Sequence, residues 1–244
     1  MMPPSIIENI RKKSASVYDV AIIGAGAAGL FCAGLAAAQG WKTVLIDHRQ
    51  RVAEKIRISG GGRCNFTNLH SQPANFLSNN PHFAKSALAR FTPQDFIALV
   101  ERYNIPYHEK KLGQLFCDNS AQDIIDLLLA ECHTHGVKNA FGVSVTGVSR
   151  QESTFHIETD NGLFTANRLV VATGGLSIPK IGATGFGYDM ARQFGLPVLA
   201  PRAGLVPLTF TDQMRADCAN LSGLSVEADV QYGKTTFAEG LLFT

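Results

Sequence analysis

Residues 18–47, YDVAIIGAGAAGLFCAGLAAAQGWKTVLID, decide the fold of this chain. An apolar run at Tyr18–Ile23 is followed by a glycine turn at residues 24–26 and by a stretch of small residues, Ala27–Gln39, that ends before a glycine. A second apolar run covers Trp41–Asp47. A strand, a glycine turn, a helix and a second strand within about 30 residues form a βαβ unit, which predicts an α/β fold with a parallel sheet.

The glycines of the first turn have the spacing of a dinucleotide-binding fingerprint, Gly24-x-Gly26-x-x-Gly29. The first glycine makes the turn, the second lets a pyrophosphate approach the backbone, and the third lets the helix pack on the strand. The free N–H groups at the start of the helix, at Ala27 and Ala28, then face the phosphate charge. We therefore expect a dinucleotide here; the alternative is a glycine-rich helix that packs without a ligand.

Asp47 ends the second strand at the offset where this fingerprint places an acidic residue, about 20 residues further on. A carboxylate there binds the hydroxyls of an adenosine ribose and disfavours NADP, whose 2′-phosphate would meet a negative charge. Arg49 lies two residues further along the chain, so NADP is disfavoured but stays an alternative.

The fingerprint does not separate FAD from NAD, but three further features favour FAD. The fingerprint lies at the N-terminus, and a later strand, LVVATGG at 169–175, brings a second glycine turn toward the same cofactor. Between them, residues 143–166 read as strands around the hairpin turn Asp160-Asn161-Gly162, which leaves no room for repeated βαβ units.

A second glycine-rich loop, SGGGRCNFTN, covers Ser59–Asn68. Adjacent glycines permit positive φ and close approach to a flat or anionic group. Arg63 can counter phosphate or the charge of a reduced flavin, and Asn65 can hydrogen-bond a ring edge; the alternative is a flexible surface loop. Cys64 has no second cysteine at the C-x4-C spacing of flavin disulfide reductases, so dithiol chemistry is not expected. Two interpretations of Cys64 remain: a lone thiol beside the flavin, or a side chain that only packs in the core.

Composition places further limits on function. The chain has 22 Lys and Arg against 20 Asp and Glu, and 45% of its residues are hydrophobic, which excludes a disordered protein. A formal net charge of +2 does not indicate the basic surface that nucleic-acid-binding proteins have, so no nucleic acid partner is expected. The five cysteines include no C-x-x-C pair, which predicts reduced thiols, a cytoplasmic location and no metal site.

The apolar run from Val20 to Ala38 approaches the length of a membrane span. It contains four glycines and changes from strand-like to helix-like period midway, so we expect neither a membrane segment nor a secretion signal.

We expect an N-terminal extension at 1–16, the N-terminal portion of an FAD-binding domain at 17–200, and the start of a β-rich substrate domain at 201–244. Capping residues predict helices at 94–103 and 121–133, and a further helix is expected at 186–194 after the glycines of 182–187. Beyond residue 201, short strands are expected at 205–210, 225–231 and 241–244.

The sequence resembles the YhiN/BaiN-like bacterial flavoproteins, described as NAD(P)/FAD-dependent or aminoacetone oxidase-like oxidoreductases. The resemblance is carried by IIGAGAAGL (22–30), KIRISGGGRCNFTN (55–68), LGQLFCDNSAQDI (112–124), VVATGGLSIPKIGATGFGYDMA (170–191), AGLVPL (203–208) and LLFT (241–244). It implies a Rossmann-like FAD-binding domain of the two-dinucleotide-binding flavoprotein type, interrupted by an inserted β-rich domain. Members of this family continue beyond LLFT, so a C-terminal truncation with weak FAD retention is expected.

The resemblance also implies where the cofactor lies. The glycine turn would hold the pyrophosphate, Val145 would meet the adenine, and the second glycine loop with residues 173–175 would lie near the flavin. The expected cofactor-binding residues are Gly24, Gly26, Ala27, Ala28, Gly29, Asp47, His48, Lys55, Ser59, Gly61, Gly62, Arg63, Cys64, Asn65, Val145, Thr173, Gly174 and Gly175. Two departures stand out: Ala53-Glu54 occupies the place of the usual Gly-Arg, and Phe186 that of a common acidic residue.

The leading hypothesis is an FAD-dependent oxidoreductase that transfers hydride between flavin and a small organic substrate, with NAD(P)H as a candidate electron donor. No side chain can be assigned as general acid or base. Two alternatives stay open: a non-catalytic flavin-binding redox or regulatory protein, and a tRNA-modifying flavoenzyme. The substrate and the oligomeric state do not follow from the sequence.

Overall fold

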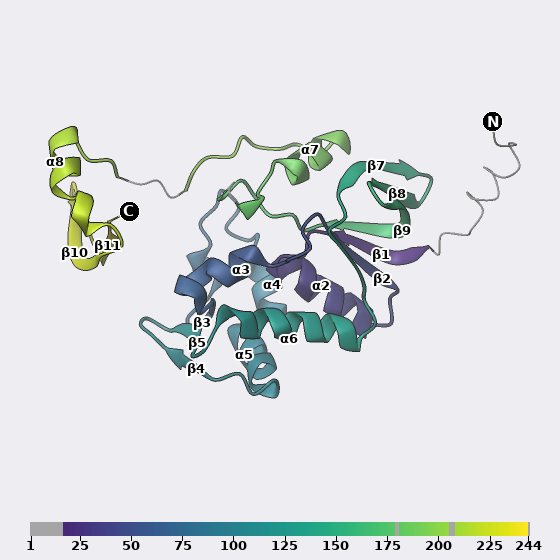
Figure 1. Cartoon of the computed structure of the whole chain (residues 1–244), viewed down its shortest axis with the longest axis horizontal. Coiled ribbons are helices and arrows are strands. Elements are labelled where there is room, and N and C mark those ends of the chain that lie inside the picture. The colour runs from purple at the N-terminus through teal and green to yellow at the C-terminus, as the bar shows by residue number, and fades with distance from the viewer. Residues whose placement is uncertain (1–16, 179–180, 205–207, 244) are drawn as a thin grey trace, which may run out of the picture. The chain divides into compact units, whose positions relative to one another are not determined.

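The computed structural model describes residues 17–178, 181–204 and 208–243 (Figure 1). The chain divides into two compact units, with the boundary between Val198 and Leu199. The expected N-terminal extension, residues 1–16, lies outside the described residues.

The first unit is built on a six-stranded sheet with the order β6-β2-β1-β9-β8-β7. In the centre, β1 pairs in parallel with β2 on one side and with β9 on the other, so that Ile22 lies opposite both Leu45 and Val170. The predicted βαβ unit and its parallel sheet are therefore confirmed. The strands are β1 (Tyr18–Ile23), β2 (Thr43–Asp47), β6 (Lys138–Phe141), β7 (Val145–Gln151), β8 (Thr154–Thr159) and β9 (Gly162–Val171).

The strand β9 differs from the sequence prediction, in which the strands of 143–166 end at Ala166 and a separate strand begins at Leu169. The structure shows one continuous strand of ten residues. Its first half, up to Ala166, pairs antiparallel with β8, and its second half pairs in parallel with β1. The two residues between the predicted strands, Asn167 and Arg168, are exposed polar positions and contain no glycine or proline that would end the strand.

Two helices, α2 (Ala27–Ala38) and α6 (Ala121–Thr134), pack side by side along the sheet (Figure 1). Gly34 permits their close approach because it has no side chain. A Cβ at this position would lie only 3.3 Å from Glu131 Cβ. Leu30 and Ile125 are fully buried in the shared core, and each contributes about 1.5–3 kcal/mol to folding. The predicted start of α6 is confirmed by a capping box between Ser120 and Asp123.

A second, three-stranded sheet has the order β3-β5-β4; of its strands the sequence predicts only a short one at 113–117. Short helices and turns surround it, and they are held to α2 by an edge-to-face contact between Phe31 and Phe91 at 4.9 Å. The elements are α3 (Glu54–Ile58), η1 (Ser59–Gly62), β3 (Asn65–Asn68), η2 (Pro73–Asn75), α4 (Lys85–Arg90), α5 (Pro93–Arg102), β4 (Tyr107–Glu109) and β5 (Gln114–Cys117). The last helix of the first unit is α7 (Phe186–Gln193), with Gly185 as its N-cap, in agreement with the helix expected at 186–194.

The second unit contains α8 (Asp212–Asp217), η4 (Ala219–Leu221), and an antiparallel hairpin of β10 (Ser225–Tyr232) and β11 (Thr235–Leu242). β10 confirms the predicted strand at 225–231. Of the predicted strand at 205–210, residues 208–210 are not in a strand, and residues 205–207 lie outside the described part of the chain. The predicted strand at 241–244 overlaps only the end of β11.

Among the described residues, no helix is long and apolar enough to cross a membrane. The apolar run of the sequence is divided between β1 and the 12-residue helix α2.

Candidate cofactor-binding site

A cavity of about 390 Å³ opens at the carboxyl ends of β1, β2 and β9. This is the edge of a parallel sheet where open α/β folds bind ligands, and the volume lies within the range of about 300–1,000 Å³ usual for small-molecule sites. The cavity is lined by residues 23–28, 46–49, 51–56, 143–145, 172–174, 181–184 and Phe186.

The three fingerprint glycines have separate roles. Gly24 has φ +104°, and a Cβ there would lie 2.6 Å from the Ala172 carbonyl oxygen, so it permits the turn against the end of β9. A Cβ at Gly29 would lie 1.7 Å from the Gly24 carbonyl oxygen, so this glycine lets α2 pack on the turn. At Gly26, by contrast, a Cβ would meet no atom within 4 Å. Gly26 therefore leaves open space at the cavity wall.

The N-terminus of α2 faces this space without a cap. No side chain accepts a hydrogen bond from its first turn, and that turn contains no acidic residue. Ala27 and Ala28 are exposed and line the cavity. Free backbone N–H groups and the positive end of the helix dipole together form a site for an anion such as a pyrophosphate.

Asp47 ties the end of β2 to the glycine turn. Its Oδ2 accepts a hydrogen bond from the backbone N–H of Ala25 at 2.6 Å, and its Oδ1 accepts one from the backbone N–H of Arg49 at 2.8 Å. Each carboxylate oxygen has a second lone pair, so the side chain can still accept hydrogen bonds from ribose hydroxyls. The carboxylate thus has a structural role that the sequence did not indicate, and ribose binding stays a prediction.

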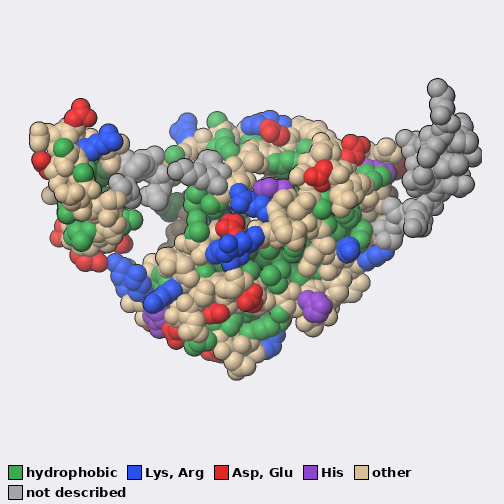
Figure 2. Space-filling view, viewed as in Figure 1, with side chains coloured by type: hydrophobic (Ala, Val, Ile, Leu, Met, Phe, Trp, Pro, Cys, Tyr) green, Lys and Arg blue, Asp and Glu red, His purple; other side chains and the backbone are tan. Residues whose placement is uncertain are grey.

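Four basic side chains, His48, Arg49, Arg51 and Lys55, line the same cavity. Lys55 Nζ donates to Ser177 Oγ at 2.7 Å, which places its charge beside the turn that follows β9. Over the part of the first unit where α3 lies, Lys and Arg side chains lie next to Asp and Glu side chains (Figure 2). The cavity lining also contains Asp47 and Glu54, so acidic groups partly balance the cations.

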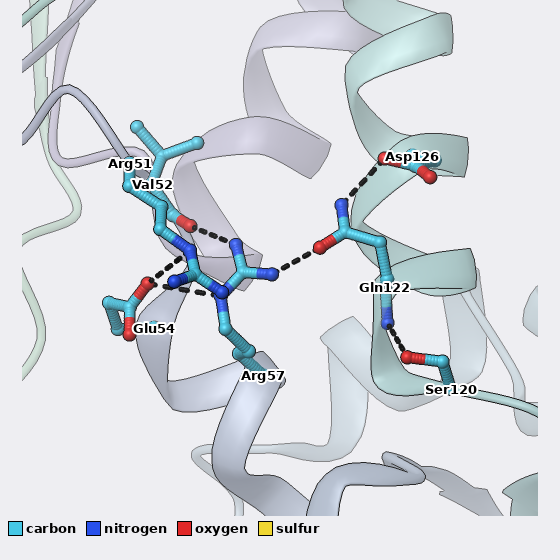
Figure 3. A network of polar contacts seen from close by, with 7 residues as sticks. All are labelled: Arg51, Val52, Glu54, Arg57, Ser120, Gln122 and Asp126. Atoms are coloured by element: carbon cyan, nitrogen blue, oxygen red, sulfur yellow. Dashed lines mark hydrogen bonds and ion pairs between the residues drawn. The ribbon is translucent and has the colours of Figure 1, made fainter.

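A polar network surrounds Glu54, the second residue of the unusual Ala53-Glu54 pair (Figure 3). Glu54 Oε1 lies 3.0 Å from Arg57 Nε and 3.4 Å from Arg51 Nε, so its negative charge is shared by two guanidinium groups. Arg57 also donates to the Val52 carbonyl at 3.2 Å and to Gln122 Oε1, which holds α3 to α6. Ala53 itself is buried with φ +63°.

Thr173 offers the clearest sign that the cavity takes a ligand. Its hydroxyl oxygen is buried and has no hydrogen-bond partner, although a buried polar group without a partner is costly. Thr173 lines the cavity directly after β9 and next to Gly174, which has φ +75°. The open space at Gly26, the uncapped helix and this orphaned hydroxyl all fit a bound dinucleotide.

The structure brings ten of the predicted site residues together around the cavity: Gly24, Gly26, Ala27, Ala28, Asp47, His48, Lys55, Val145, Thr173 and Gly174. Eight others lie outside its lining: Gly29, Ser59, Gly61, Gly62, Arg63, Cys64, Asn65 and Gly175. Their roles stay predictions. Lining residues that the site prediction omitted include Arg49, Arg51 and 181–184. The glycine spacing at 182–187 was a signal for the last of these, since Gly182 has φ +92° beside Arg49.

In the second glycine loop, Gly60 serves packing. It has φ +57°, and a Cβ there would lie 2.6 Å from the Phe116 ring of β5. At Gly61 a Cβ would meet nothing within 4 Å, so the loop is open on its outer side. The loop therefore rests on the small sheet through one glycine and exposes the next.

Cys64 is buried in the hydrophobic core, and burial raises the pKa of its thiol. Burial likewise raises the pKa of Cys117 to about 12. Both thiols are therefore protonated at neutral pH, which favours the packing interpretation of Cys64 over thiolate chemistry.

The βαβ unit, the uncapped helix and the cavity at the strand ends define a Rossmann-type dinucleotide-binding domain. The family model described as the HI0933-like protein Rossmann domain matches residues 18–228, and the chain belongs to this family, within the YhiN/BaiN-like flavoprotein superfamily. The predicted α/β fold class is thereby confirmed.

Two relatives carry the same name, ribosomal RNA dihydrouridine synthase. The protein from Escherichia coli (strain K12) is 49% identical over 228 residues, which cover 93% of this chain and 57% of the relative. The protein from Haemophilus influenzae is 48% identical over 229 residues, which cover 91% and 57%. This chain thus spans little more than half the length of these curated relatives.

Among solved structures, glycine oxidase from Bacillus cereus superposes with a TM-score of 0.46 and 17% identity. The match covers 67% of this chain and 56% of the oxidase.

The relatives correct one prediction and support another. The expectation that no nucleic acid is a partner is wrong, because both relatives are named for ribosomal RNA. A net charge summed over the whole chain does not exclude a locally basic surface. Both relatives are named as enzymes, which supports the prediction of an enzyme and not a non-catalytic redox protein.

Proposed function

We propose that this chain is the dinucleotide-binding part of a flavin-dependent enzyme that reduces uridine in ribosomal RNA to dihydrouridine. The observation that carries this proposal is the 48–49% identity to two enzymes of that name over more than nine-tenths of the chain. Among the hypotheses drawn from the sequence, the tRNA-modifying flavoenzyme is nearest to this function. The leading hypothesis proposed a small organic substrate, and here the proposed substrate is a base in RNA.

The chemistry is a two-electron reduction. Dihydrouridine differs from uridine by two hydrogen atoms across the C5–C6 bond, so one ring carbon must receive a hydride and the other a proton. Bound FAD would supply this hydride from its reduced form, and NAD(P)H is the proposed reductant that regenerates the reduced form and is itself oxidised to NAD(P)⁺. What this chain must provide is a site that holds the cofactor in place.

The cavity residues suit this task. The N–H groups of Ala27 and Ala28 would hold the pyrophosphate in the space beside Gly26, and Asp47 would accept hydrogen bonds from the ribose. Thr173 would donate its unpartnered hydroxyl to an acceptor of the cofactor. Lys55, which lies next to Gly174, adds a positive charge on the same side of the cavity.

We further propose that residues 17–200 form the N-terminal portion of an FAD-binding domain and that 201–244 begin a β-rich domain. Ser59–Asn65 and Gly175 would lie toward the flavin end of the cofactor. A cytoplasmic location accords with a substrate that is part of the ribosome.

The test is a reaction of the purified protein with FAD, NADH or NADPH, and ribosomal RNA transcribed in vitro, which carries no modification. We expect nucleosides from the digested RNA to include uridine heavier by two hydrogen atoms, as seen by mass spectrometry. Reactions without FAD, and with a Gly26→Ala variant, serve as matched controls. Flavin that is bound and reduced while the RNA stays unmodified would refute the proposed substrate.

A further inference from the structure

Acidic residues are absent from a long part of this chain. Between Lys55 and Gln94 there is no Asp or Glu, while five Lys and Arg are present. The other 204 residues contain 17 basic and 20 acidic side chains. The near-neutral total therefore hides a basic segment, residues 55–94, within a slightly acidic remainder.

The structure holds both ends of this segment in place. At its start, Lys55 lines the cofactor cavity and Arg57 is bound in the network with α6. Further along, Asn68 Nδ2 donates to the Leu112 carbonyl at 2.9 Å. Near its end, Phe91 packs on Phe31 of α2. The segment is therefore anchored to the first unit near both of its ends.

The middle of the segment exposes large apolar side chains. Phe76 is 52% exposed, Leu77 is 94% exposed and Phe83 is 83% exposed. Exposed aromatic rings provide flat faces on which unpaired bases stack. Exposed amide, hydroxyl and imidazole side chains lie near them in the chain and can hydrogen-bond base edges: His70, Gln72, Asn75, Ser78, Asn79, Asn80 and His82.

Three cations of the segment, Arg63, Lys85 and Arg90, are exposed. In the described part of the chain none of them makes an ion pair with an acidic side chain. Their charge is therefore available to phosphates, and no carboxylate of the same segment opposes it.

We propose that residues 66–90 form an RNA-binding surface that receives a single-stranded or looped part of the ribosomal RNA substrate. Lys85 and Arg90 bind phosphates, and Phe76 and Phe83 stack on unpaired bases. Looped RNA fits better than a duplex because stacking on aromatic rings requires bases that are free of their partners. This inference rests on the proposed function and adds the surface that recognises its substrate.

The charge contribution is tested with a double variant, Lys85→Gln with Arg90→Gln. Binding of a fluorescent ribosomal RNA fragment is measured by anisotropy over a range of salt concentrations. Each lost phosphate contact lowers the slope of log affinity against log salt by about 0.7 for single strands, so we expect a loss of about 1.4. The matched control, Lys138→Gln with Arg150→Gln, removes two exposed cations elsewhere in the first unit and should keep the wild-type slope.

The stacking contribution is tested with Phe83→Ala. Loss of one stacked base should weaken RNA binding roughly 5-fold to 100-fold with little change in the salt slope. Leu196→Ala, at another exposed apolar position, is the control and should bind RNA like the wild type. Thermal unfolding and FAD titration of each variant confirm that the fold and the cavity are intact.

The outcomes separate this inference from the proposed function. If the protein modifies or binds ribosomal RNA and the segment variants behave like their controls, the surface is refuted while the function stands. If Phe83→Ala changes self-association and leaves RNA affinity unchanged, the apolar side chains serve a protein contact and the inference is overturned. If the wild type neither binds nor modifies ribosomal RNA, the proposed function itself fails.

Discussion

The variant Gly26→Ala separates cofactor binding from folding. A methyl group at this position would meet no protein atom within 4 Å, and the backbone (φ −84°, ψ −169°) is allowed for alanine. Alanine is a poorer N-cap than glycine by about 0.5–1 kcal/mol, but it also restricts the unfolded chain by about 0.4–1 kcal/mol. These effects oppose each other, so the free energy of unfolding should change by less than about 1 kcal/mol.

The same methyl group fills the space beside the N–H groups of Ala27 and Ala28. A hydrogen bond to a charged group contributes about 1.5–3 kcal/mol, so blocking two of them should weaken FAD binding by at least about 100-fold. The companion variant Gly29→Ala places a Cβ 1.7 Å from the Gly24 carbonyl oxygen and should destabilise the fold by about 3 kcal/mol or more.

Urea denaturation gives the stabilities, and quenching of flavin fluorescence gives the affinities. The expected pattern is a stable Gly26→Ala protein that binds FAD poorly and an unstable Gly29→Ala protein. A Gly26→Ala protein that binds FAD like the wild type would refute the assignment of the pyrophosphate to this space. Equal destabilisation by both variants would refute the division of roles between the glycines.

Three further predictions concern other parts of the first unit. Thr173→Val removes a buried hydroxyl that has no hydrogen-bond partner, so the free energy of unfolding should not fall. The same variant should weaken FAD binding roughly 3-fold to 10-fold in a fluorescence titration. Unchanged affinity would contradict a role of the hydroxyl in binding. Arg57→Met leaves Glu54 without its inner partner and should cost about 1–3 kcal/mol in urea denaturation, whereas an unchanged midpoint would show that the network adds little. Burial raises the pKa of Cys117 from 9.0 to about 12, so the unfolded chain loses this proton first and stability should fall as pH rises from about 9 toward 12. Denaturation at pH 8 and pH 10 should show this fall, and a Cys117→Ala variant should show a smaller one.

The sequence predicted the centre of the fold well because its local signals agree. Apolar runs, a glycine turn and a helix stop at Gly40 each favour the same elements at 18–47, and the structure has them within two residues. The cavity at their carboxyl ends follows from parallel pairing alone. The expected site residues of the glycine turn and of the strand ends line it for that reason, whereas Lys55 and Val145 reach it from α3 and β7.

Other features depend on contacts distant in sequence. The continuity of β9 is decided by pairing with β8 on one side and β1 on the other, which no local pattern shows. The small sheet was hard to predict because its strands have three or four residues each. The role of Gly60 could not be foreseen, since its close neighbour Phe116 lies 56 positions along the chain.

The single strand β9 also fixes the distance between a surface hairpin and the cofactor cavity. Its first half belongs to the antiparallel hairpin with β8, and its second half delivers Thr173 and Gly174 to the cavity. One residue inserted at the exposed turn near Asn161 would lengthen the hairpin without moving the cavity wall. One residue inserted at Asn167 would reverse the faces of all the following side chains and displace Thr173. The turn can therefore vary in length during evolution, while the segment from Ala166 to Gly174 must keep its length for the cavity to persist.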